Sequence, residues 1–135
     1  MRVVLDTNVL VYGIFFSGPP ADILKAWRCG EVQFVLTPAI VDEYVRVAGI
    51  IADGFPDIEI KSILTLIVAN SDVVQPPSLS YQISEDPDDD KFLTCALASK
   101  SSTIVSGDKH LLKLSGYHGI TVLTPRAFVN QYLKK

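Results

Sequence analysis

The chain has 135 residues, of which 48% are hydrophobic and 20% are charged. This length predicts one domain, residues 1–135, and the apolar content excludes an intrinsically disordered protein. The formal net charge is −3, which gives no direct support for a nucleic-acid ligand. No apolar run approaches the roughly 18 residues of a membrane span, and no signal-peptide pattern is present, so we expect a cytoplasmic protein without a membrane segment. Cys29 and Cys95 have no metal-ligand spacing, and we expect both to be reduced core residues.

The first half of the chain alternates short apolar runs with segments of helical periodicity. Ser-Gly-Pro-Pro at 17–20 separates the first two helices, and Gly30 ends the second. Thr37 and Pro38 predict an N-cap followed by proline at the first helical position. The predicted strands and helices of this half are, in chain order, Val3–Leu5, Asn8–Phe16, Ala21–Cys29, Val32–Leu36, Pro38–Ala48 and a helix opened by Pro56.

The second half of the chain continues the same alternation. A loop is expected over Pro76–Ser84, and Asp86 with Pro87 should cap the helix that follows. Strands separated by helices predict a three-layer α/β/α fold with a mostly parallel central sheet of four to five strands. The predicted elements are the strand Val73–Val74, a helix from Asp86 to about Lys100, the strand Thr103–Ser106, the helix Lys109–Leu114, the strand Ile120–Leu123 and a helix capped by Thr124 and Pro125.

Carboxylates occupy several positions that solubility does not explain. Asp6 and Asp108 each follow a predicted strand, and ligands of open α/β sheets bind at the carboxyl ends of strands. N-capping of the following helix is an alternative explanation for each of them. Glu43 lies on the inward stripe that Ile40 and Val47 define on their helix. A glutamate there either reaches solvent at the edge of the core or must be paired or bound to a cation, and we favour the second interpretation.

A further acid comes from the acidic run at residues 85–90, at the start of a predicted helix. The helix macrodipole favours negative charge in the first turn and is sufficient to explain Asp88. Asp89 and Asp90 both border the buried face of the helix, which Leu93 marks, so geometry alone does not choose between them. A cluster of carboxylates would repel itself without a cation, and ligands that are all oxygen point to Mg²⁺ or Mn²⁺.

The net charge is compatible with a polyanionic substrate when the clustered acids are counted separately from the rest of the chain. Asp6, Glu43, Asp90 and Asp108, together with Glu85, Asp86, Asp88 and Asp89, account for eight of the fifteen carboxylates. The other seven face twelve Lys and Arg, which leaves +5 on the rest of the chain. The basic residues are scattered along the sequence, so the charge permits a polyanionic substrate without indicating one.

The acids and the residues around them resemble the PIN-domain family. The resemblance rests on Asp-Thr-Asn-Val-Leu at 6–10, Thr-Pro-Ala-Ile-Val-Asp-Glu at 37–43, Asp-Pro-Asp-Asp-Asp-Lys-Phe-Leu at 86–93 and Ile-Val-Ser-Gly-Asp at 104–108. The most similar subgroup is the small PIN proteins that act as VapC-type toxins of toxin–antitoxin pairs. The resemblance implies a Mg²⁺- or Mn²⁺-dependent ribonuclease, with RNA as substrate, a small antitoxin protein as partner and a homodimer or higher homo-oligomer as the assembly.

The family pattern also implies roles for individual residues. Asp90 is preferred to Asp89 as the third acid because its separation from Asp108 fits the family's spacing. Asn8 and Ser106 match the family's polar positions and, with Asp89, are expected to support the metal or the substrate phosphate. Some members have Ser/Thr-Arg-Asp where this chain has Ser-Gly-Asp, so the phosphate contact of that arginine has no counterpart at 106–108. The implied catalytic and metal-binding acids are Asp6, Glu43, Asp90 and Asp108.

Other functions compete with this interpretation. A phosphatase of the haloacid dehalogenase type needs a second aspartate two residues after the first, where this chain has Asn8. A phospho-receiver domain needs a lysine at the end of a late strand, and the segment 120–124 has none. Two alternatives stay open, namely a PIN scaffold that only binds RNA or protein, and a PIN RNA-processing nuclease without an antitoxin. The presence of all four acids argues against the binding-only scaffold.

Overall fold

The computed structural model describes residues 1–75, 90–101 and 103–133, and its centre is one parallel β-sheet. The strands are β1 Arg2–Leu5, β2 Gln33–Leu36, β3 Asp72–Val73, β4 Thr103–Val105 and β5 Thr121–Leu123. Their order in the sheet is β3-β2-β1-β4-β5, and each neighbouring pair is parallel. The predicted parallel α/β architecture is therefore confirmed.

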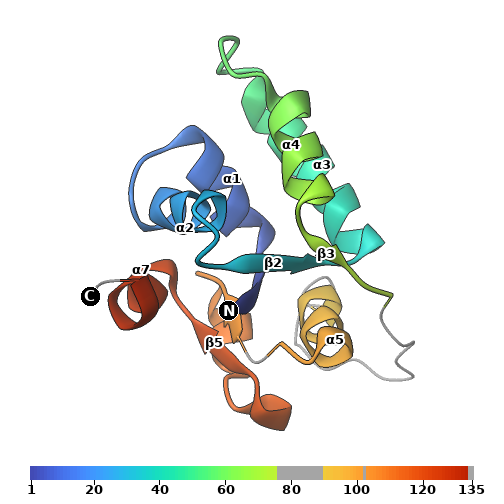
Figure 1. The fold of residues 1–135 in the computed structure, drawn as a ribbon, viewed down its shortest axis with the longest axis vertical. Coiled ribbons are helices and arrows are strands. Elements are labelled where there is room, and N and C mark those ends of the chain that lie inside the picture. Colours follow the sequence, from blue (N-terminus) through green and yellow to red (C-terminus); the bar gives the residue numbers. More distant parts are fainter. Residues whose placement is uncertain (76–89, 102, 134–135) are drawn as a thin grey trace.

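Helices cover both faces of the sheet. The helices are α1 Thr7–Phe15, α2 Pro19–Arg28, α3 Pro38–Ala52, α4 Ile60–Ala69, α5 Asp90–Ser99, α6 Lys109–Leu112 and α7 Pro125–Phe128, with a 3₁₀ turn at Tyr117–Gly119 and a π-helical stretch at Val129–Leu133. In Figure 1, α1 to α4 lie on one side of β2 and α5 lies on the other, which gives the predicted three layers. No helix in the described part of the chain is long and apolar enough to cross a membrane.

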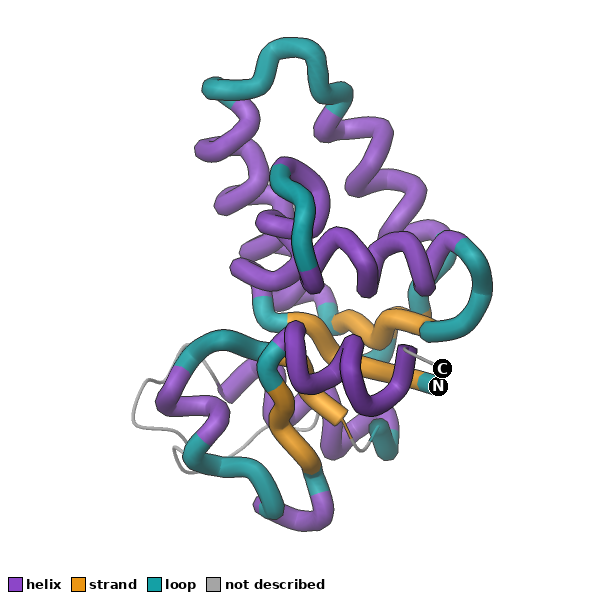
Figure 2. Tube along the Cα trace, turned by 90° about the vertical axis from the view of Figure 1, so that its left-hand side faces the viewer, coloured by secondary structure: helices purple, strands orange, loops and turns teal. Residues whose placement is uncertain are grey.

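The hairpin formed by α3 and α4 projects from the sheet, with its connecting loop at the far end (Figures 1 and 2). α3 runs through Gly49 past the predicted end at Ala48, because the partly buried Ile51 continues to pack on the core and a single glycine inside a helix is tolerated. α4 begins at Ile60 rather than at Pro56, since Pro56 lies in a turn that includes the bond from the Ile58 N–H to the Phe55 carbonyl, 3.0 Å. The predicted loop and helix cap over 76–87 lie outside the described residues.

The second helix differs from its predicted limits at both ends. Pro19 and Pro20 lie in the first turn of α2 rather than in the break before it, because a proline there has no N–H to leave unsatisfied. Gly18 precedes them with φ +121°, a conformation that favours glycine. Because α2 ends at Arg28, Cys29 is exposed, and the expectation that it is a core residue was wrong. Cys95 is buried as expected, and both thiols are free.

The strand order reverses between β1 and β4. From β1 the chain proceeds to β2 and β3 on one side, then crosses back to β4 and β5 on the other. In open α/β sheets, ligands bind outside the carboxyl ends of the strands at such a switch point. The two strands that flank it end at Leu5 and Val105, which face each other in the pairing of β1 with β4. Asp6 follows the first of them directly, and Asp108 follows the second by three residues.

Candidate active site

Asp6 stands at the end of β1 and is 7% exposed. Its N–H donates to the Val105 carbonyl at 2.9 Å, and its own carbonyl accepts the N–H groups of Val9 and Leu10, so its backbone joins the sheet to α1. The carboxylate makes no capping bond to α1. Its Oδ2 instead accepts a hydrogen bond from Ser106 Oγ at 2.6 Å. Helix capping therefore does not explain the side chain of Asp6.

Ser106 connects Asp6 to Asp108. Its side chain is fully buried, and Oγ also accepts the N–H of Asp108 at 2.9 Å. Asp108 is half-buried, and its Oδ1 accepts the N–H of His110 at 2.7 Å, so one of its oxygens does cap α6 as the alternative explanation expects. A single buried hydroxyl thus fixes the carboxylate of Asp6 relative to the loop that carries Asp108.

A cavity of about 250 Å³ opens at this point. The predicted site residues Asp6, Asn8 and Asp108 all line it, from the ends of β1 and β4 and the first turn of α1. Glu43 and Asp90 do not belong to its lining. Among the residues that the structure describes, the lining is Asp6, Asn8, Val9, Tyr12, Pro20, Gly107, Asp108 and Pro125.

Glu43 approaches the same strand end from α3. Its side chain is 16% exposed, and Thr7 Oγ1 donates to its Oε2. Its Oε1 lies 2.5 Å from Lys91 Nζ and 3.9 Å from Arg46 Nη2. Glu43 is therefore a paired, partly buried carboxylate, and Thr7 links it to the residue that follows Asp6.

Three residues outside the predicted set orient these acids. Tyr44 is buried, and its hydroxyl donates to the Leu5 carbonyl at 2.6 Å, which holds α3 against the end of β1. Thr7 was not among the predicted site residues, although a polar side chain directly after a strand-end acid is a signal for a supporting role. Lys91 offered a similar signal, because it is the first cation after the acidic run.

Asp90 begins α5 and is half-buried. Because the next residue, Lys91, bonds to Glu43, the start of α5 lies beside Glu43. The alternative third acid, Asp89, lies outside the described residues. Within residues 1–75, 90–101 and 103–133, no three His, Cys, Asp or Glu side chains stand close enough together to hold a metal ion. The four-acid metal site stays a prediction.

Charge is compensated differently at Asp6 and Glu43. Burial raises the pKa of Asp6, and the nearby charges of Asp108 and Glu43 raise it further, which outweighs the hydrogen bonds that lower it. Burial alone would also raise the pKa of Glu43, but the hydrogen bonds from Lys91 and Thr7 and the charge of Lys91 hold it below its ordinary value. An additional cation would stabilise the charged form of the Asp6 carboxylate. A set of ligands that are all oxygen fits a hard divalent cation such as Mg²⁺ or Mn²⁺.

We expect Lys91→Met to lower the free energy of unfolding of the metal-free protein by about 1–3 kcal/mol at neutral pH, because Glu43 then stays partly buried without its cation. A carboxylate whose pKa is lowered in the fold contributes stability above its unfolded pKa and loses it as pH falls. The deficit should therefore shrink when the pH falls below 4.5, the ordinary pKa of Glu43.

Urea unfolding in EDTA at neutral and acidic pH measures this deficit. Lys109→Met is the matched control, since Lys109 is exposed and its loss should change stability little. An equal deficit at both pH values would show that Lys91 acts through packing rather than through charge.

Known proteins match the chain over most of its length. The family model for the PIN domain matches residues 2–110, from the start of β1 to just past Asp108. An uncharacterized protein of Methanocaldococcus jannaschii, MJ1680, is 28% identical, and the alignment covers 99% of this chain and 93% of that protein. The matched segment contains all of the acids predicted from the sequence.

Proposed function

This chain belongs to the PIN-domain family, and from that membership and the geometry of its acids we propose that it is a Mg²⁺- or Mn²⁺-dependent endoribonuclease. PIN domains are generally nucleases, so we expect the protein to cleave a phosphodiester bond in a nucleic acid. RNA as the polymer, the divalent metal and internal cleavage are the finer parts of the proposal.

The observation that carries the proposal is the joined pair Asp6 and Asp108. Ser106 connects them at the point where the strand order reverses, and both line one cavity. Burial and the neighbouring carboxylates raise the pKa of Asp6, so its charged form is disfavoured in the metal-free protein. A bound cation would stabilise that charged form. An acid used only to cap a helix needs neither the burial nor the neighbouring acid.

We propose that Asp6, Glu43, Asp90 and Asp108 hold the metal. When bound, Mg²⁺ or Mn²⁺ supplies Lewis-acid stabilisation of the phosphate charge and activation of a water. Ser106 keeps the Asp6 carboxylate in place, and Thr7 with Lys91 does the same for Glu43. Asn8 is exposed in the cavity and would hydrogen-bond a phosphate oxygen or a water. Hydrolysis would leave a 5′-phosphate on one product and a 3′-hydroxyl on the other.

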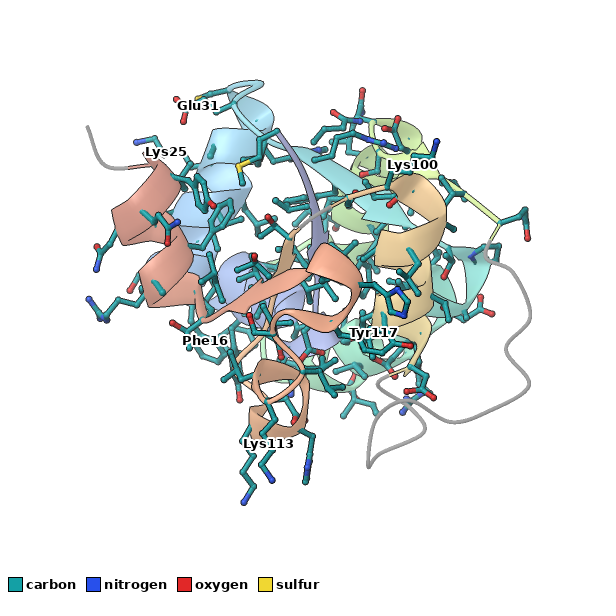
Figure 3. The ribbon with its side chains drawn as sticks, turned by 90° about the horizontal axis from the view of Figure 1, so that it is seen from below. Phe16, Lys25, Glu31, Lys100, Lys113 and Tyr117 are labelled. Atoms are coloured by element: carbon teal, nitrogen blue, oxygen red, sulfur yellow. The ribbon has the colours of Figure 1, made fainter. Side chains whose placement is uncertain are left out.

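Cations near the acids support a polyanionic substrate. The basic residues are scattered in the sequence, but Arg46 lies 3.9 Å from Glu43, and Lys109 directly follows Asp108. Lys113 lies one turn further along and extends from the body of the protein into solvent (Figure 3). Phosphate contacts from such residues give affinity that falls as salt rises.

We further propose that this single-domain protein acts in the cytoplasm as the toxin of a toxin–antitoxin pair, with a small antitoxin and a second copy of itself as partners. A protein partner is supported by an apolar cavity of about 400 Å³ between α1, α2 and α4, where Leu66 is 60% exposed. Co-expression with the product of a neighbouring small gene tests this assignment. A stable complex that suppresses growth inhibition supports the toxin, and a nuclease without effect on growth supports an RNA-processing role.

The nuclease proposal is tested by incubating the purified protein with a mixture of single-stranded and duplex RNA. We expect cleavage with Mg²⁺ or Mn²⁺, 5′-phosphate product ends, and no cleavage in EDTA. Substrate binding should weaken as salt is raised. RNA binding without cleavage in either metal would instead identify the binding-only scaffold.

A further inference from the structure

An exposed aromatic ring shares the cavity with the acids. Tyr12 lies on α1 four residues after Asn8, so the two side chains occupy one face of the helix, one turn apart. Both line the same cavity as Asp6 and Asp108. Tyr12 is 52% exposed, whereas its neighbour Val11 is fully buried. The core therefore gains little from this ring.

A neighbouring ring packs against Tyr12. Phe16 packs on it edge-to-face, with ring centroids 5.6 Å apart and planes at 65°. Phe16 in turn packs edge-on against Phe55, with centroids 5.5 Å apart, in the loop between α3 and α4. Edge-to-face packing fixes the plane of a ring without covering both of its faces. Tyr12 is thus an exposed aromatic surface beside the acids that a second ring contacts.

We propose that Tyr12 stacks on an unpaired nucleobase that flanks the cleaved phosphate, so that the substrate is single-stranded RNA at the cleavage site. This inference rests on the proposed ribonuclease function. Each base is joined to its phosphate through one sugar, so a phosphate held beside Asp6 and Asp108 by the cation proposed there would bring a flanking base to the same cavity. Pro20 and Pro125, which also line it, add apolar surface for that base.

The chemistry of stacking restricts the substrate to unpaired nucleotides. In an A-form duplex the bases are stacked on each other, and their faces are closed to a protein side chain. An aromatic ring that stacks on bases accepts any of them, because every base has a π-face.

Binding of a short fluorescent single-stranded oligoribonucleotide tests the inference. Measured with Mn²⁺ and an oligoribonucleotide with non-hydrolysable linkages, so that all of the proposed metal ligands stay in place, Tyr12→Ala should weaken binding by roughly 5- to 150-fold, the loss of one stacked base. Tyr12→Phe and Tyr12→Trp keep a ring and should bind within about threefold of the unaltered protein. Affinity for fully duplex RNA should be the same for all of them. The bases of the oligonucleotide can also be replaced one at a time by abasic sites. At one position, the base that stacks on Tyr12, this replacement should make the Tyr12→Ala variant bind as well as the protein with Tyr12.

The control is Tyr132→Ala, because Tyr132 is also partly exposed, at 41%, but does not line the cavity. It should leave RNA affinity unchanged. If the unaltered protein cleaves RNA and Tyr12→Ala binds single strands equally well, the stacking inference is overturned while the nuclease proposal stands. A Tyr12→Ala variant that changes the molecular mass in solution rather than RNA affinity would assign the ring to a protein interface. If no form binds or cleaves RNA, the nuclease proposal itself fails.

Discussion

Asp6→Asn and Asp108→Asn should each lower RNA cleavage by more than about 100-fold, because loss of a ligand exceeds the 10- to 100-fold typical of losing a supporting partner. Both proteins should remain folded. An amide oxygen at position 6 can still accept from Ser106, and one at position 108 can still accept the N–H of His110. What each substitution removes is the negative charge that holds a divalent cation. Initial rates with saturating Mn²⁺ and thermal unfolding of the same samples check both parts.

The matched control for these variants is Asp42→Asn, on the same helix as Glu43 but exposed. It removes one negative charge without touching the cavity, so its cleavage rate should stay within about twofold of the unaltered protein, as for surface substitutions in general. Cleavage that survives both Asp6→Asn and Asp108→Asn would point to a contaminating nuclease and leave the enzyme proposal without support.

The sheet and the position of its acids follow from local sequence patterns. A short apolar run, a polar residue and a helical pattern recur along the chain, which is sufficient to predict parallel strands with helices between them. Placing Asp6 and Asp108 at strand ends needs no knowledge of distant contacts. That the two strands are neighbours is a property of topology, and the hydrogen bond from Ser106 to Asp6 joins residues 100 positions apart.

Two of the features that the sequence did not predict depend on such distant contacts, and a third depends on a helix boundary. Lys91 and Glu43 are 48 residues apart, and only the packing of α5 near α3 makes them an ion pair. The exposure of Cys29 depends on where α2 ends, and boundaries are the least determined part of a helical pattern. The supporting role of Thr7 is likewise set by α3, which brings Glu43 over the start of α1.

Millimolar Mn²⁺ or Mg²⁺ should raise the melting temperature of the protein by roughly 5–15 °C, because a ligand at 100 times its Kd stabilises the native state by about 2.7 kcal/mol. The reason lies in the uncompensated charge of Asp6, whose pKa burial and the neighbouring carboxylates raise. Asp6→Asn should greatly reduce the shift, whereas Asp42→Asn should keep it. The measurement is a thermal scan in EDTA and in each metal at matched ionic strength. The same melting temperature with and without millimolar Mn²⁺ would contradict the metal-site proposal.

The pH dependence of the stability of the metal-free protein tests the contribution of the Asp6 charge separately. A carboxylate whose pKa is raised in the fold favours the folded state below its unfolded pKa, and that contribution is lost as pH rises through the folded pKa. In EDTA, Asp6→Asn should therefore unfold at a higher temperature than the unaltered protein at neutral pH. The difference in melting temperature between the two proteins should become smaller as the pH falls to 3.8, the ordinary pKa of Asp6, and below. Glu43 acts in the opposite direction, but it is present in both proteins, so the difference between them reports on Asp6. A gap that is constant with pH would mean that the asparagine stabilises the fold without relieving any charge.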